Sequence, residues 1–128
     1  MDRESLNRLS KIVLESSIEV HRNLGPGLLE STYEVCLCKE LKLRNLNYIR
    51  QVSLPVLYKG ESLNAEYKID ILVENELIIE LKAVEELLPV HLAQLLTYLK
   101  LSDKRLGLLI NFNVPRLVDG VRRVVNNF

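Results

Sequence analysis

Charged side chains interrupt two apolar, strand-like runs near the middle of the chain. Asp70 lies within Lys-Ile-Asp-Ile-Leu-Val, and Glu80 and Lys82 lie within Leu-Ile-Ile-Glu-Leu-Lys, so the spacing is D-x9-E-x-K. Removing a carboxylate from water costs several kcal/mol even after the protein relaxes. Two carboxylates that approach each other also repel. A cationic group must offset that cost, and a lysine together with a divalent metal ion would do so.

Strand geometry predicts how these groups lie. Because side chains alternate between the faces of a strand, Glu80 and Lys82 share one face, while Ile79 and Leu81 point to the other face for packing. A short turn separates the two runs, so strand pairing brings Asp70 near them. Carboxylates on adjacent strands form an oxygen site suited to Mg²⁺ or Mn²⁺. Such an ion can polarise a phosphodiester and activate water, with Lys82 stabilising the developing charge. The alternative is that all three form ordinary ion pairs on an exposed sheet face.

The apolar periodicity of the chain changes several times between helical and strand-like. Pro55 within the first strand favours an edge position or a bulge. A helix between the third and fourth strands allows those strands to pair in parallel through a right-handed crossover. The predicted order is ααβββαβα, an α/β fold with a mixed β-sheet flanked by helices. The expected helices cover 4–23, 28–44, 89–101 and 114–126, and the expected strands cover 48–58, 63–74, 77–83 and 106–112.

Length and composition limit the possibilities. The 128 residues, 48% of them hydrophobic, predict one folded domain, 1–128. The N-terminus has no apolar signal-like stretch and no run spans a bilayer, so we expect a cytoplasmic protein without a membrane partner. Cys36 and Cys38 lie two apart in a predicted helix, which favours core packing over a disulfide or zinc site.

The charge balance argues against a strongly basic nucleic-acid-binding surface. The chain has 17 basic and 17 acidic residues, whereas duplex-binding proteins often carry a clear basic excess. Any contact with nucleic acid must use a local basic patch, although solvated faces would explain the same residues. The candidates are Lys39, Lys42, Arg44, Arg50, Arg116, Arg122 and Arg123.

Two helices carry further polar candidates. Glu30 and Tyr33 are one helical turn apart in the second helix, although the helix dipole alone favours an acid at the first turn. His91, Gln94 and Tyr98 follow at steps of three and four, which places them on one stripe of the next helix. That stripe could contact a substrate or a phosphate, or it could be a solvated face.

In this order, the motifs resemble the GxxExxY family of the PD-(D/E)XK nuclease superfamily over nearly the whole chain. The superfamily's Pro-Asp pair reads Ile69-Asp70 here, which leaves the carboxylate in place. The segments that carry the resemblance are GPGLLESTY (25–33), YKIDILV (67–73), IIELKAV (78–84), LPVHLAQLLTYLK (88–100) and GLLINF (107–112).

The resemblance implies a restriction-endonuclease-like core and a nuclease dependent on Mg²⁺ or Mn²⁺. Asp70, Glu80 and the main-chain carbonyl of Leu81 would hold the metal, joined by Glu30, and Lys82 would be the catalytic lysine. The other implied site residues are Gln94 and Tyr98, which would orient the substrate or the lysine, with Tyr33 and His91 as further candidates for positioning the substrate.

The implied partner is nucleic acid, with DNA favoured, and a domain of this size would dimerise to span a duplex. Two alternatives remain open at the level of sequence. One is a catalytically weak or inactive module that binds nucleic acid or protein on the nuclease fold. The other is a subunit that becomes active only with a partner protein.

Overall fold

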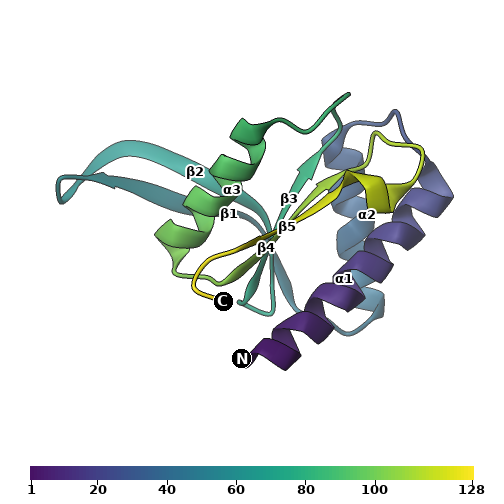
Figure 1. The fold of residues 1–128 in the computed structure, drawn as a ribbon, viewed down its shortest axis with the longest axis horizontal. Coiled ribbons are helices and arrows are strands. Elements are labelled where there is room, and N and C mark those ends of the chain that lie inside the picture. The colour runs from purple at the N-terminus through teal and green to yellow at the C-terminus, as the bar shows by residue number, and fades with distance from the viewer.

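The computed structural model has a five-stranded sheet with helices on both faces (Figure 1). It describes residues 1–128, except for the side chains of residues 64 and 65. The helices are α1 (Arg3–Leu24), α2 (Glu30–Leu43) and α3 (Pro89–Ser102), with a 3₁₀ turn, η1 (Leu117–Gly120). The strands are β1 (Tyr48–Tyr58), β2 (Glu61–Val73), β3 (Leu77–Lys82), β4 (Leu106–Asn111) and β5 (Val121–Val125).

The strands lie in chain order across the sheet, and one pair is parallel. β1 pairs with β2, β2 with β3, and β4 with β5 in antiparallel fashion, whereas β3 and β4 are parallel. α3 connects the parallel pair, which confirms the predicted crossover and the mixed α/β class. Pro55 lies on β1, an edge strand, and the β1–β2 register shifts between Pro55 and Leu57. The predicted edge position and irregularity are therefore both confirmed.

Both faces of the central strands are covered. α1 and α2 pack on one face, where Ile79 and Leu81 join the larger hydrophobic cluster, as the alternation predicted. α3 packs on the opposite face against a second cluster that contains Ile78 and Leu109. Both cysteines are free, and Cys38 is buried in the larger cluster, as expected for core packing. No helix among the described residues is long and apolar enough to cross a membrane.

The prediction of a final helix over 114–126 is wrong. This segment forms η1 and then β5, which pairs with the outer edge of β4. Its valines are β-branched and favour strands, and β4 offers an unpaired row of backbone groups. Gly120 lies at the end of η1, directly before β5. A Cβ there would lie 2.2 Å from the carbonyl oxygen of Asn111, so the backbone approaches too closely for any other residue. Sequence periodicity alone does not reveal that edge.

Candidate metal and phosphodiester site

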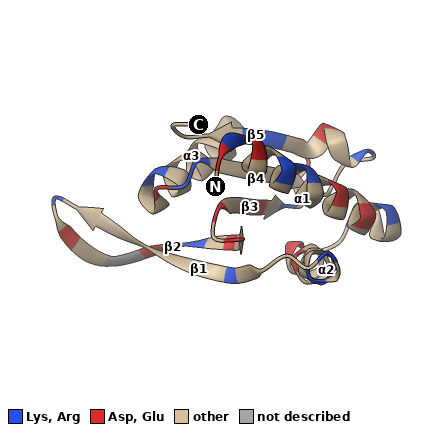
Figure 2. Cartoon of the chain, turned by 90° about the horizontal axis from the view of Figure 1, so that it is seen from below, with Lys and Arg blue, Asp and Glu red and all other residues tan. Residues whose placement is uncertain are grey.

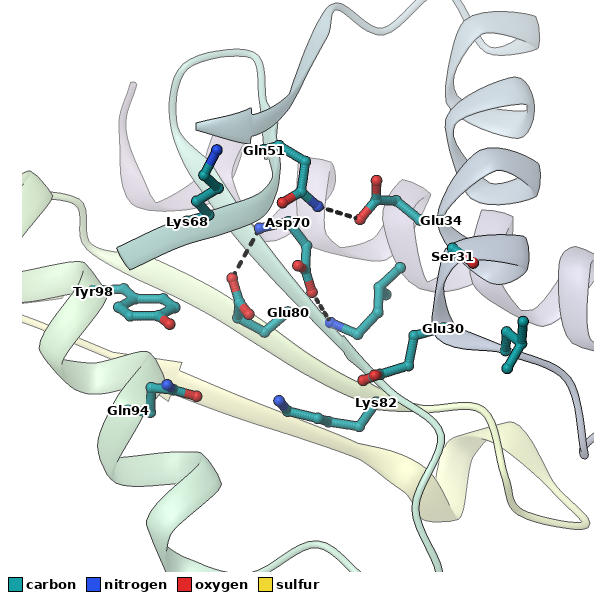
Figure 3. A pocket seen from close by; sticks show the side chains of 12 residues that line it. Glu30, Ser31, Glu34, Gln51, Lys68, Asp70, Glu80, Lys82, Gln94 and Tyr98 are labelled. Carbon is teal, nitrogen blue, oxygen red and sulfur yellow. Dashed lines mark hydrogen bonds between the residues drawn. The ribbon is translucent and has the colours of Figure 1, made fainter. Parts of the chain in front are cut away.

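The two central carboxylates lie where β2 and β3 separate. The recorded β2–β3 pairing ends at Ile71 and Ile79. Beyond it, the carboxylate of each strand accepts a hydrogen bond from a backbone N–H of the other strand. Glu80 Oε1 accepts a hydrogen bond from the backbone N–H of Asp70 at 3.0 Å, and Asp70 Oδ2 accepts one from the N–H of Leu81 at 2.8 Å (Figure 3). Each bond holds one oxygen of a carboxylate against a backbone N–H of the neighbouring strand.

A pocket of about 580 Å³ opens at this separation. Because the strands diverge there, side chains from α2 and α3 reach the carboxylates from two sides (Figure 3). Glu30, Asp70, Glu80, Leu81 and Lys82 all line the pocket, as the sequence predicted for a shared site. The remaining lining residues are Leu29, Ser31, Glu34, Gln51, Lys68, Gln94 and Tyr98.

The pocket disfavours negative charge on the two carboxylates. Burial, reinforced by the charge of Asp70, raises the pKa of Glu80 from 4.5 to about 8. Burial also raises the pKa of Asp70, opposed by the hydrogen bond from the N–H of Leu81. Tyr98 has a pKa raised to about 12, mainly by burial and also by the two acidic groups, so its phenol keeps its proton. The site therefore has a strong preference for an added positive charge.

The donors of the site fit a hard divalent cation. Asp70 and Glu80 supply carboxylate oxygens, the ligand type that Mg²⁺ and Mn²⁺ prefer. Within the part of the chain that the structure describes, no group of three or more His, Cys, Asp or Glu side chains is arranged to hold a metal. A cation would therefore complete its shell with main-chain oxygen, water or substrate, as Mg²⁺ commonly does.

The glycine-rich loop and Tyr33 orient the start of α2. Gly25 has φ 68° and ψ −175°, a conformation that is almost exclusive to glycine. The Tyr33 hydroxyl donates to the Gly25 carbonyl at 2.6 Å and accepts from the N–H of Leu28 at 3.2 Å. Its ring is fully buried and stacks on Phe112 with a centroid distance of 4.4 Å. Tyr33 thus holds the loop before Glu30 and is not among the residues that line the carboxylate pocket, so a role in positioning the substrate stays a prediction.

The polar stripe of α3 divides between two pockets. Gln94 and Tyr98 line the carboxylate pocket, whereas His91 lines only the neighbouring one. His91 Nδ1 accepts a hydrogen bond from the N–H of Leu88 at 2.9 Å, which caps the helix. The stripe is therefore not simply a solvated face, and His91 lies outside the carboxylate pocket.

Glu34 was not among the predicted site residues, although it lies one helical turn beyond Glu30. It is buried, and its Oε2 accepts from Arg50 Nε at 2.9 Å and from Nη2 at 2.8 Å. Its Oε1 accepts from Gln51 Nε2 at 2.8 Å. Arg50 therefore forms an ion pair with Glu34 at the edge of the pocket, although its own side chain is exposed. In the sequence, the i+4 spacing from Glu30 is the signal that could have identified Glu34 as a site residue.

Gln51 and Lys68 were also missed. Gln51 has a φ of 52°, which is unusual for a residue other than glycine, and the β1–β2 pairing skips it between Arg50 and Val52 while the register stays the same. Its amide donates to Glu34 and lines the pocket. Lys68 adds a second lysine to the pocket lining. Outside the pocket, Figure 2 shows basic and acidic residues interspersed along the helices and strands.

The sheet topology and the paired carboxylates agree with the comparisons with known proteins. A family model of the PD-(D/E)XK nuclease superfamily matches residues 7–124, and the chain belongs to this superfamily. The chain is also 28% identical over 114 residues to "Cytoplasmic export protein 1" of Saccharomyces cerevisiae. That alignment covers 88% of this chain and 14% of the yeast protein, so the chain spans a small part of its relative. No solved structure matches the chain significantly.

Proposed function

We propose that the protein is a nuclease that uses Mg²⁺ or Mn²⁺ to hydrolyse phosphodiester bonds in nucleic acid, with DNA the favoured substrate. The observation that carries the proposal is the pair formed by Asp70 and Glu80, held by backbone N–H groups of adjacent strands at the wall of one pocket. Superfamily membership supports the same chemistry. Within the superfamily, the segment from Gly27 to Tyr33 favours the GxxExxY group.

The proposed roles follow from the position of each group. Asp70, Glu80 and the Leu81 carbonyl would hold the cation, whereas Glu30 lines the same pocket from the start of α2 without forming a three-carboxylate group with them among the described residues. The cation would polarise the phosphodiester and supply an activated water. Lys82 lies beside the carboxylates in the same pocket and would stabilise negative charge that develops on phosphorus.

Other lining residues would position the substrate. Gln94 can donate an amide N–H to a phosphate oxygen, and the protonated Tyr98 phenol can donate from the same helix. Lys68 offers a second cation for the nucleic-acid backbone. Glu34 would act indirectly, because it holds Gln51 at the wall of the pocket.

A cleavage assay tests the proposal. Purified protein is incubated with single-stranded, duplex and branched DNA and with RNA, with and without Mg²⁺ or Mn²⁺. We expect metal-dependent cleavage that Lys82→Ala removes. Lys100→Ala is the matched control, because Lys100 is exposed and lies outside the pocket. Absence of cleavage on every substrate, or equal cleavage by Lys82→Ala and the parent, would contradict the proposal.

The second candidate is a binding module on the same fold that has little or no turnover. The zero net charge and the small number of convergent acids favour it. Titration calorimetry with Mn²⁺ tests the nuclease candidate, because a nuclease site must bind the ion. If it does, Asp70→Asn should abolish the heat of Mn²⁺ binding. Binding of nucleic acid without cleavage under any metal condition would favour the module.

Light scattering of the protein alone and with duplex tests the expected homodimer.

A further inference from the structure

A second pocket adjoins the carboxylate pocket on the α3 side. It has a volume of about 490 Å³ and lies between β2 and the first turns of α3. Gln94 lines both pockets, so the two are neighbours on either side of one amide side chain. The other residues that line the second pocket are Tyr67, Val90, His91, Ala93 and Thr97.

The two pockets differ in their chemistry. The carboxylate pocket contains lysines and acids, as a site for a phosphate and a cation requires. None of the described residues that line the second pocket is Asp, Glu, Lys or Arg. An aromatic ring, aliphatic side chains and neutral hydrogen-bonding groups surround its volume instead. This environment suits a flat, uncharged, partly polar group better than a phosphate.

Two rings in the second pocket are already oriented. Tyr67 is 40% exposed, and its ring packs against Tyr98 with a centroid distance of 5.3 Å. Because the Nδ1 of His91 accepts from the N–H of Leu88, a neutral imidazole carries its proton on Nε2 and can donate from that edge. The pocket thus offers an aromatic surface for stacking together with hydrogen-bonding groups.

We propose that the second pocket binds the base of an unpaired nucleotide whose neighbouring phosphate lies in the carboxylate pocket. This inference rests on the proposed function and names its substrate class, a single strand or an unpaired end. In a duplex the bases stack on one another and pair in the interior, so a base enters a side pocket only after unpairing. Stacking on an aromatic ring tolerates every base, because each has a π face.

The test measures strand binding without metal, so that cleavage is not needed as a readout. Fluorescence anisotropy is recorded with labelled oligothymidine, with an abasic strand of equal length and with a blunt duplex. The parent should bind oligothymidine roughly tenfold more tightly than the abasic strand. It should also bind oligothymidine more tightly than the duplex. This comparison uses the parent alone, so it does not depend on the folding of a variant.

Variants then assign the preference to the pocket. Tyr67→Ala should weaken binding of oligothymidine roughly tenfold and leave binding of the abasic strand unchanged, whereas Tyr67→Phe keeps the ring and should bind like the parent. Tyr58→Ala is the matched control, since Tyr58 is 59% exposed on β1 and lines neither pocket. Equal loss on both strands, or no loss on either, overturns the inference.

The result separates this inference from the proposed nuclease function. Cleavage of oligothymidine with Mn²⁺, together with equal affinity for the intact and abasic strands, would leave the nuclease in place and remove the base pocket. A Tyr67-dependent preference for the intact strand without cleavage under any metal condition would support the base pocket and contradict the nuclease. A parent that binds none of the three probes overturns the base pocket.

Discussion

Replacing Glu80 by glutamine should stabilise the metal-free protein at alkaline pH. In the folded protein the pKa of Glu80 is raised to about 8, against 4.5 for an ordinary glutamate. Below 4.5 the group is protonated in both states and carries no penalty. As the pH rises from 4.5 to about 8, the unfolded chain ionises first, so stability is progressively lost. Each tenfold difference in proton affinity corresponds to about 1.4 kcal/mol, which gives an upper limit of about 5 kcal/mol.

Glutamine removes the ionisation but keeps the shape of the side chain. Its carbonyl oxygen can still accept from the N–H of Asp70, as Glu80 does in the parent. The free energy of unfolding of Glu80→Gln should therefore be close to that of the parent at about pH 5 and exceed it by a few kcal/mol at about pH 9. Urea unfolding at several pH values, performed with a chelator, measures this difference.

The exposed Glu86 supplies the matched control, because Glu86→Gln removes a carboxylate that faces solvent. A Glu80→Gln difference that stays constant with pH, or a parent that gains stability relative to Glu80→Gln as the pH rises, would refute the electrostatic reasoning.

Three further predictions concern the scaffold. Tyr33→Phe should lower the free energy of unfolding by about 1–3 kcal/mol in urea titrations, because a buried hydrogen bond of the glycine loop is lost. Gly120→Ala should lower it by more than about 2 kcal/mol, since its Cβ meets the Asn111 carbonyl; equal stability would contradict the described packing. Iodoacetamide at neutral pH should spare Cys38 in mass spectra, because burial raises its pKa to about 11, and rapid labelling of the folded protein would contradict this.

The sequence predicted the centre of the site because its signal is local. Charges at Asp70, Glu80 and Lys82 stand out against apolar neighbours, and strand alternation assigns Glu80 and Lys82 to one face. The separation of β2 and β3 has no comparable signal. It is accompanied by hydrogen bonds from backbone N–H groups to the two carboxylates, and these contacts become visible only with the strands in place.

The features that sequence reasoning missed depend on contacts between distant segments. Glu34 meets Arg50, 16 positions away, only because α2 packs beside β1. Tyr33 reads as a partner of Glu30 on one helical face, yet its ring turns into the core toward Phe112. β5 forms because β4 offers a free edge, and a valine-rich segment takes it in preference to the predicted helix.

The proposed function requires that Asp70 and Glu80 together hold a divalent cation at the point where β2 and β3 diverge. Anomalous diffraction from crystals soaked in Mn²⁺ tests it most directly. We expect a strong peak within coordination distance of both carboxylates, and no such peak in Asp70→Asn crystals soaked in the same way. Fully occupied Mn²⁺ sites elsewhere in the parent crystals, with none between these two side chains, would contradict it.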